Sequence, residues 1–161
     1  MIILRGVDRF VSAVDLKVRQ MQLATKLATS EALHLLERRI KLKLRTYTHQ
    51  RGTPTPSGSG DPPALVSGNL RRGVQVGPPG GPENIGANRW RGWVGPTAVY
   101  GRIQELGGEI HTPSSSSMVM SGTPGSGIWL PARPYVRPAL TESMGEIQAI
   151  FRRRWTEATL K

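Results

Sequence analysis

The three histidines, His34, His49 and His111, are the first side chains to consider for catalysis or metal binding. No two of them have the spacing that a metal site requires, and the carboxylates nearest to them are isolated in the sequence. The chain has no cysteine, which excludes disulfides, thiolate zinc sites and cysteine nucleophiles. The histidines therefore indicate neither a metal centre nor an acid–base pair.

Two other stretches contain residue types found in active sites, but neither has the pattern that the chemistry needs. The serines at 114–117 lie in Ser/Gly/Pro-rich sequence without a nucleophile-elbow pattern. The Gly-rich stretch 77–86 lacks the Gly-Lys-Ser/Thr ending of a phosphate-binding loop. The 11 acidic residues are spread singly, so no pair of carboxylates is available for a hydrolase. We expect a protein that is not an enzyme and holds no cofactor.

Positive charge is the strongest chemical feature of the chain. Its 22 Lys and Arg residues against 11 Asp and Glu residues give a formal net charge of +11, which favours nucleic acid, an anionic membrane or an acidic protein as partner. Arg38, Arg39 and Lys41 begin a basic helix face that could contact such a partner or could simply be solvated. Trp90 between two arginines would suit base stacking, but no helix-turn-helix, zinc-finger or RNA-recognition pattern accompanies it.

Helices are expected at both ends of the chain, and its 161 residues are enough for one domain with a modest core. Residues 8–48 repeat apolar side chains at spacings of three, four and seven, which predicts a helix with Asp8 as N-cap and a break near Ser30. Residues 138–160 predict a second amphipathic helix. Its apolar face would comprise Leu140, Met144, Ile147, Phe151 and Trp155.

Short antiparallel strands are expected between these helices. Residues 70–76 and 89–95 alternate in character and predict one hairpin, while 109–111 and 128–130 predict another. Residues 97–106 predict a short helix ended by two glycines. The expected class is therefore α+β, with a long N-terminal helical region and a C-terminal helix packed on a small, mainly antiparallel sheet with long hairpin loops.

Three stretches rich in Gly, Ser and Pro, residues 51–63, 77–86 and 112–127, predict flexible loops within this single domain. The last of them carries Met118, Val119 and Met120 as an apolar tip, which makes these three side chains candidates for contact with a partner. No stretch approaches the ~18 apolar residues of a membrane span, and the short apolar N-terminus predicts no secretory leader.

The segment 130–140 interleaves prolines and arginines directly before the C-terminal helix. Pro131 and Pro134 fix φ and push the residues before them away from helical geometry, so this segment should be extended or turned. Pro138 suits the first turn of a helix. We expect a stiff connection that places the C-terminal helix at a defined angle to the sheet.

Three stretches taken together resemble one protein family. Residues 65–74, Leu-Val-Ser-Gly-Asn-Leu-Arg-Arg-Gly-Val, are similar to a Thr-Gly-x-Leu-Arg sequence at the start of that family's first strand. Residues 100–108, Tyr-Gly-Arg-Ile-Gln-Glu-Leu-Gly-Gly, are similar to its tyrosine-to-glutamate-phenylalanine-glycine segment. Residues 131–140, Pro-Ala-Arg-Pro-Tyr-Val-Arg-Pro-Ala-Leu, are similar to its Pro-Ala-Arg-Pro-Phe-Leu-Arg-Pro-Ala sequence. The family is that of the small neck proteins of long-tailed bacteriophages, the gp-ten-like head–tail connector and tail-completion group.

The resemblance implies a structural virion protein that assembles in the host cytoplasm as a ring in the neck, completing the tail or joining it to the head. The ring would be a hexamer or a dodecamer, in contact with other neck and tail proteins, with passing DNA, and with no membrane. The long loops depart from the family pattern, and we expect 51–63 and 112–127 to order only on assembly. The positions that match the family motifs, and are candidates for interfaces, are Gly68, Leu70, Arg71, Tyr100, Glu105, Gly107, Pro131, Arg133, Pro134, Tyr135, Arg137 and Pro138. A basic nucleic-acid-binding protein remains the alternative.

Overall fold

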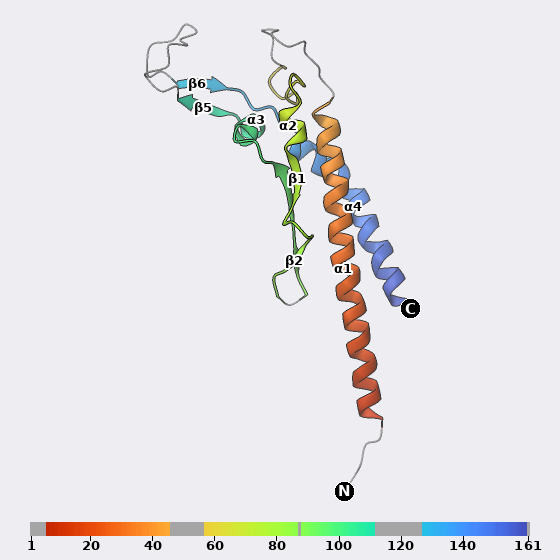
Figure 1. Cartoon of the computed structure of the whole chain (residues 1–161). Helices are drawn as coiled ribbons and strands as arrows, with labels where there is room; N and C mark the ends of the chain where they lie inside the picture. The colour runs from red at the N-terminus through yellow and green to blue at the C-terminus, as the bar shows by residue number, and fades with distance from the viewer. Residues whose placement is uncertain (1–5, 46–56, 87, 112–126, 161) are drawn as a thin grey trace. The chain divides into compact units, whose positions relative to one another are not determined.

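The computed structural model describes residues 6–45, 57–86, 88–111 and 127–160 of the chain (Figure 1). Its long helices are α1 (Val7–Lys43) and α4 (Val136–Thr159), and its short helices are α2 (Asn69–Arg72) and α3 (Gly101–Leu106). The strands are β1 (Val74–Gly77), β2 (Glu83–Asn84), β3 (Trp90–Arg91), β4 (Trp93–Pro96), β5 (Gly108–His111) and β6 (Gly127–Leu130). The expected α+β class is confirmed.

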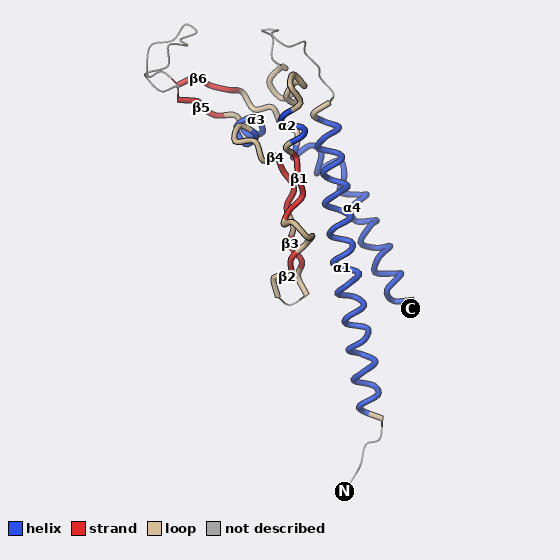
Figure 2. Tube along the Cα trace, in the orientation of Figure 1, coloured by secondary structure: helices blue, strands red, loops and turns tan. Residues whose placement is uncertain are grey.

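The strands form separate two-stranded sheets, β1 with β4, β2 with β3 and β5 with β6 (Figure 2). In the antiparallel β2–β3 pair Glu83 lies opposite Arg91, and in the antiparallel β5–β6 pair Gly108 lies opposite Leu130. The predicted hairpin of 109–111 with 128–130 is therefore confirmed. Pairs this short depend on packing against other elements for their stability.

The predicted first strand is wrong at its beginning, because residues 69–72 form the helical turn α2. Gly68 precedes this turn with φ 74°, a conformation that favours glycine. Its carbonyl accepts a hydrogen bond from the Arg72 N–H at 2.9 Å, which closes the turn before the strand starts at Val74. Alternation of side chains over so few residues did not distinguish one helical turn from a strand.

The chain divides into two compact units. Unit 1 comprises Met1–Glu37, Val76–Val94 and Glu142–Lys161, and unit 2 comprises Arg38–Gln75 and Gly95–Thr141.

Within unit 1, α1 and α4 run antiparallel side by side (Figure 1). The Glu31 carboxylate on α1 pairs with Arg153 and with Arg154, the latter at 3.0 Å. Two turns away, the Trp155 indole N–H donates to the Thr25 hydroxyl at 3.1 Å. Small buried side chains on α1 allow close approach at this seam; they are Ala24, Ala28 and Ala32.

The β2–β3 hairpin lies against another side of α1 in the same unit. A Cβ added at Gly92 would clash with the end of the Leu33 side chain, so a larger residue here would require that side chain to move. The Lys26 ammonium lies over the Trp90 ring at 5.6 Å, within range of a cation–π interaction. Trp90 is half-buried, which agrees with a role in packing.

The predicted break near Ser30 is wrong, because α1 is continuous from Val7 to Lys43. The hydroxyls of Thr25 and Thr29 donate to the carbonyls four residues earlier, each at 2.8 Å. These hydroxyls therefore find acceptors inside the helix, by sharing the carbonyls that also accept its backbone hydrogen bonds. Asp8 lies in the first turn rather than at the N-cap.

The apolar face predicted for α4 is only partly correct. The predicted start of this helix near Pro138 is confirmed within two residues, but Leu140 and Met144 are 40% and 44% exposed. The buried positions of α4 are instead Ala139 and Ser143. Both of these buried residues are small, and hydrophobicity alone did not identify them.

Candidate assembly site

The start of α4 is held by one carboxylate from α3. Glu105 accepts hydrogen bonds from the backbone N–H groups of Tyr135, Val136 and Arg137 at 2.7, 2.9 and 2.9 Å. The first N–H groups of a helix have no partner inside the helix, and negative charge is stabilised at this end. Pro138 has no N–H and lies in the first turn, as predicted. Glu105 therefore fixes where α4 begins relative to α3.

Glu105, Arg133 and Tyr135 connect α3 to the start of α4, and we call this contact the joint. Tyr135 is its central side chain. It is fully buried, and its hydroxyl donates to the Gly101 carbonyl at 3.0 Å. Burial raises the pKa of the Tyr135 phenol, with smaller contributions from Glu105 and Tyr100. The phenol therefore stays protonated as a donor, and it attaches the end of the proline–arginine segment to the first turn of α3.

The segment 131–134, which precedes α4, is hydrogen-bonded to α3 and to residues 57–60. The Arg133 N–H donates to the Gln104 carbonyl at 2.7 Å, and its guanidinium Nε donates to the Ser57 carbonyl at 2.9 Å. The Ala132 carbonyl accepts from the Gly60 N–H at 2.9 Å. Arg133 is only 6% exposed, so its charge is used inside unit 2.

Gly107 permits the close approach of this segment to α3. Its φ of 69° and ψ of 179° lie in a region that essentially only glycine adopts. A Cβ at this position would lie 2.7 Å from the Ala132 nitrogen and 2.9 Å from the Leu130 carbonyl oxygen. Any side chain would push residues 130–132 away from the end of α3.

The first motif contacts the second across a small cavity in unit 2. Gly68, Leu70 and Arg71 line this cavity of about 170 Å³ together with Tyr100 and Gln104. Arg71 also donates through its Nε to the Lys41 carbonyl at 3.2 Å, which attaches α2 to the end of α1. All three stretches that carry the family resemblance are thus brought together within unit 2.

Most of the motif positions serve this internal joint and offer little surface. Tyr135 and Arg133 are buried, and Pro131, Pro134 and Pro138 are half-buried. Tyr100 and Arg137 are the large exposed side chains of the set. A use of the motif positions as contacts between subunits stays a prediction, and the structure places most of them where they would set the direction of α4.

The helical cap by Glu105 could not have been read from the sequence around α4, because Glu105 and Val136 lie 31 residues apart. The resemblance alone singled out Glu105. Its position two residues before a Gly-Gly pair and ahead of a proline-rich helix start is the only local signal.

The basic surface is concentrated in unit 2. Arg38 and Arg39 are exposed, whereas Lys41 is half-buried. By sequence, unit 2 has eleven basic residues against three acidic ones, Asp61, Glu105 and Glu109. The basic residues are Arg38, Arg39, Lys41, Lys43, Arg45, Arg51, Arg71, Arg72, Arg102, Arg133 and Arg137. By this count the formal net charge of unit 2 is +8.

The predicted loops have different outcomes. Residues 57–63 are held in unit 2 through Ser57 and Gly60, and residues 77–86 contain β2. Residues 51–56 and the apolar tip Met118, Val119 and Met120 lie outside the described residues.

The described residues also bear on metal binding and on membrane insertion. Among them, no group of three or more His, Cys, Asp or Glu side chains could hold a metal ion. No helix in the described part of the chain is long and apolar enough to cross a membrane.

Comparison of the chain with protein-family models, with curated proteins and with solved structures gave no match. The resemblance to phage neck proteins therefore rests on the three short stretches at 65–74, 100–108 and 131–140. What these stretches have in common in the structure is that they build one joint.

Proposed function

We propose that this chain is a structural, non-catalytic protein of a tailed bacteriophage virion. It forms a homo-oligomeric ring in the neck, a hexamer or a dodecamer, which completes the tail or joins it to the head. The observation that carries the proposal is the meeting of the three family-like stretches in unit 2, where the third is fixed to the second through Glu105. Motif residues that act together on one helix are better explained by a shared architecture than by three separate coincidences.

The joint supports an assembly role because it makes the start of α4 rigid. A ring closes only when each subunit meets the next at a constant angle. Glu105, Tyr135 and Arg133 provide several hydrogen bonds around one helix start, which limits rotation of α4 there. Assembly in the host cytoplasm, incorporation in the virion neck and contacts with other neck and tail proteins are parts of the same proposal.

The basic surface has a place in this proposal as well. A ring in the neck lies next to acidic surfaces of other proteins and around DNA in transit. Arg38 and Arg39 are exposed candidates for such contacts. Because exposed charges are screened by salt, contacts of this kind should weaken as ionic strength rises.

The proposal is tested with the purified full-length chain. Sedimentation velocity over a range of protein concentrations should show a monomer that converts to one discrete oligomer without nucleic acid, and negative-stain images of that oligomer should show closed rings. Glu105→Ala should give fewer or irregular rings at the same concentration. A protein that stays monomeric at every concentration would refute the ring.

A second candidate function, binding of nucleic acid, is favoured by the charge of unit 2. A monomeric binder of DNA or RNA would bind through Lys and Arg contacts to phosphates, and its affinity would fall steeply with salt. Titration of labelled duplex DNA at several salt concentrations separates the two functions. Tight binding by a monomer, with a steep salt slope and no ring at any concentration, would favour this alternative.

A further inference from the structure

Helix α1 carries two exposed apolar faces in unit 1. Face A consists of Val7, Phe10, Val11, Val14 and Val18, which lie at positions i, i+3, i+4, i+7 and i+11 of α1. Face B consists of Leu16, Leu23 and Leu27, whose spacings are seven and four. Phe10 is 70% exposed and Leu16 and Leu23 are each 57% exposed, so both faces present large apolar side chains to solvent.

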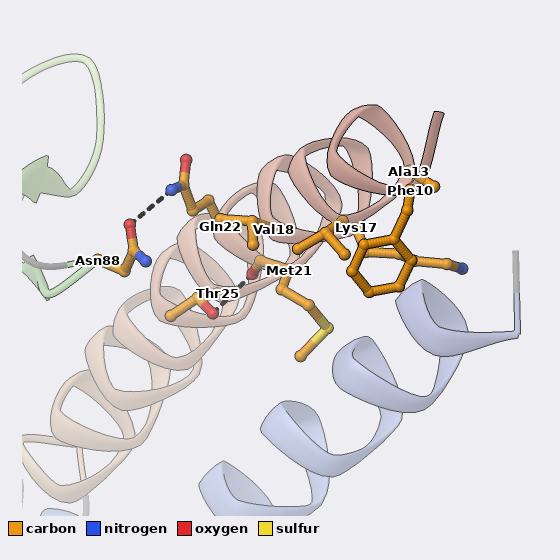
Figure 3. Close-up of a pocket in the computed structure, with 9 residues that line it drawn as sticks. Phe10, Ala13, Lys17, Val18, Met21, Gln22, Thr25 and Asn88 are labelled. Atoms are coloured by element: carbon orange, nitrogen blue, oxygen red, sulfur yellow. Dashed lines mark hydrogen bonds between the residues drawn. The ribbon is translucent and has the colours of Figure 1, made fainter. Parts of the chain in front are cut away.

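Face A lies beyond the elements that cover the rest of α1. The Lys17 ammonium donates to the Thr159 carbonyl at the end of α4, and Gln22 donates to Asn88 at 2.6 Å in the β2–β3 connection. A groove runs along this part of α1, and Figure 3 shows Phe10, Val18 and Met21 lining it. Its volume is about 460 Å³.

The two faces point in opposite directions. Each residue turns an α-helix by about 100°, so the centre of face A lies roughly half a turn around α1 from the centre of face B. A two-fold dimer through one face would leave the other face of each molecule exposed. A heterologous contact covers both, because face A of one molecule meets face B of the next.

Charges flank both faces on the same side of α1. By the same periodicity, Asp8 and Asp15 lie beside face A, and Arg19 and Lys26 lie beside face B. Both pairs are seven residues apart, so their spacing along the axis is the same. Among the described residues, Asp8, Asp15 and Arg19 take part in no ion pair, and Lys26 contacts the Trp90 ring.

We propose that the occupant of face A is face B of a second copy of this chain, with the two α1 helices parallel. A stagger of nine residues places Val7, Val14 and Val18 opposite Leu16, Leu23 and Leu27 of the neighbour. The acidic pair then lies within two residues of the basic pair, about 3 Å along the axis. In an antiparallel arrangement the charges would lie on opposite sides of the contact.

Every molecule offers one face A and one face B, so the contact repeats from copy to copy and closes as a ring when the rotation is right. This inference deepens the proposed function by naming the surface between its subunits, and it rests on the proposed ring. It does not depend on the partners of the ring in the virion.

Complementation between two variants tests the contact. Val14→Glu disrupts face A and Leu23→Glu disrupts face B, and both side chains are exposed, so folding should be unchanged by circular dichroism. Each variant alone should be monomeric at concentrations where the unchanged chain assembles. An equimolar mixture should give heterodimers and nothing larger, because one intact face A and one intact face B remain. Val99→Glu, at a 99% exposed apolar residue of unit 2, is the control and should assemble normally.

Exchange of charges tests the parallel orientation. Arg19→Glu should weaken association several-fold, and addition of Asp8→Lys in the same chain should restore it, because every contact then has the reversed pair. Failure of the double variant to recover would overturn the parallel stagger.

The outcomes separate the contact from the function. If Val14→Glu and Leu23→Glu assemble as the unchanged chain does, the inference is wrong while the ring stands. If the mixture stays monomeric although each variant alone has lost assembly, the contact is not heterologous and the inference also fails. If the unchanged chain never assembles, a second copy is not the occupant and the ring itself is refuted.

Discussion

Replacement of Glu105 by alanine removes the acceptor of three backbone N–H groups at the start of α4. Each hydrogen bond contributes a net ~0.5–1.5 kcal/mol, and the charge adds roughly 0.3–1 kcal/mol through the helix dipole. Glu105 is half-buried, so water replaces part of what is lost. We expect Glu105→Ala to lower the free energy of unfolding by about 3 kcal/mol, a shift of roughly 6–12 °C in Tm for a chain of this size.

Glu105→Gln refines the same prediction. The amide oxygen can still accept from Tyr135 and Val136, whereas the amide NH₂ would face the Arg137 N–H, donor against donor. One bond and the charge are lost, so we expect about half the effect, ~1.5 kcal/mol.

Urea unfolding, followed by tryptophan fluorescence at one low protein concentration, measures both changes while keeping association constant. Glu83→Gln is the matched control, because Glu83 forms an exposed ion pair with Arg91 at 2.7 Å. Exposed pairs contribute ~0–1 kcal/mol. An alanine variant of Glu105 no less stable than this control would refute the role of Glu105 in fixing α4.

The other predictions concern Tyr135, Glu31 and two glycines. Tyr135→Phe should cost roughly 1–3 kcal/mol, because the buried Gly101 carbonyl loses its donor. The pKa of Tyr135 is raised in the folded state, so above about pH 10 the unfolded chain loses this proton first. The free energy of unfolding should therefore fall as the pH rises above about 10, and less steeply in Tyr135→Phe. The Arg153 and Arg154 guanidinium groups lower the pKa of Glu31, so stability should fall as the pH drops below about 4. Glu31→Gln should flatten that acid limb in a pH series of urea unfolding, and an unchanged limb would contradict the pairing. Gly107→Ala should lower the free energy of unfolding by at least roughly 1–3 kcal/mol, because the backbone conformation at this position is strained for alanine. Gly145→Ala, in an open stretch of α4, should instead stabilise by ~0.5–1 kcal/mol. Thermal melts of the two glycine variants must therefore shift in opposite directions.

The sequence was informative where apolar periodicity and backbone restrictions were strong. Periodicity predicted both long helices, and proline chemistry predicted that α4 begins near Pro138. Periodicity could not show that the first turns of α1 remain uncovered, because the stripe from Val7 to Leu35 has the same pattern whether or not α4 covers it. Coverage depends on where α4 ends, which is a property of the tertiary structure.

The candidate site was less predictable than the elements that build it. Glu105 acts on a helix that begins 31 residues later, and no local rule connects the two. The division of charge is equally non-local, because unit 2 combines residues 38–75 with 95–141. Ser143 was missed because serine is mostly exposed in proteins, whereas this serine is fully buried.

Native mass spectrometry of the purified chain over a range of concentrations shows directly whether the proposed ring forms. We expect a single closed species of six or twelve subunits that forms without nucleic acid. A spectrum that contains only monomer at every concentration, or an open series of species that grows without limit, would contradict it.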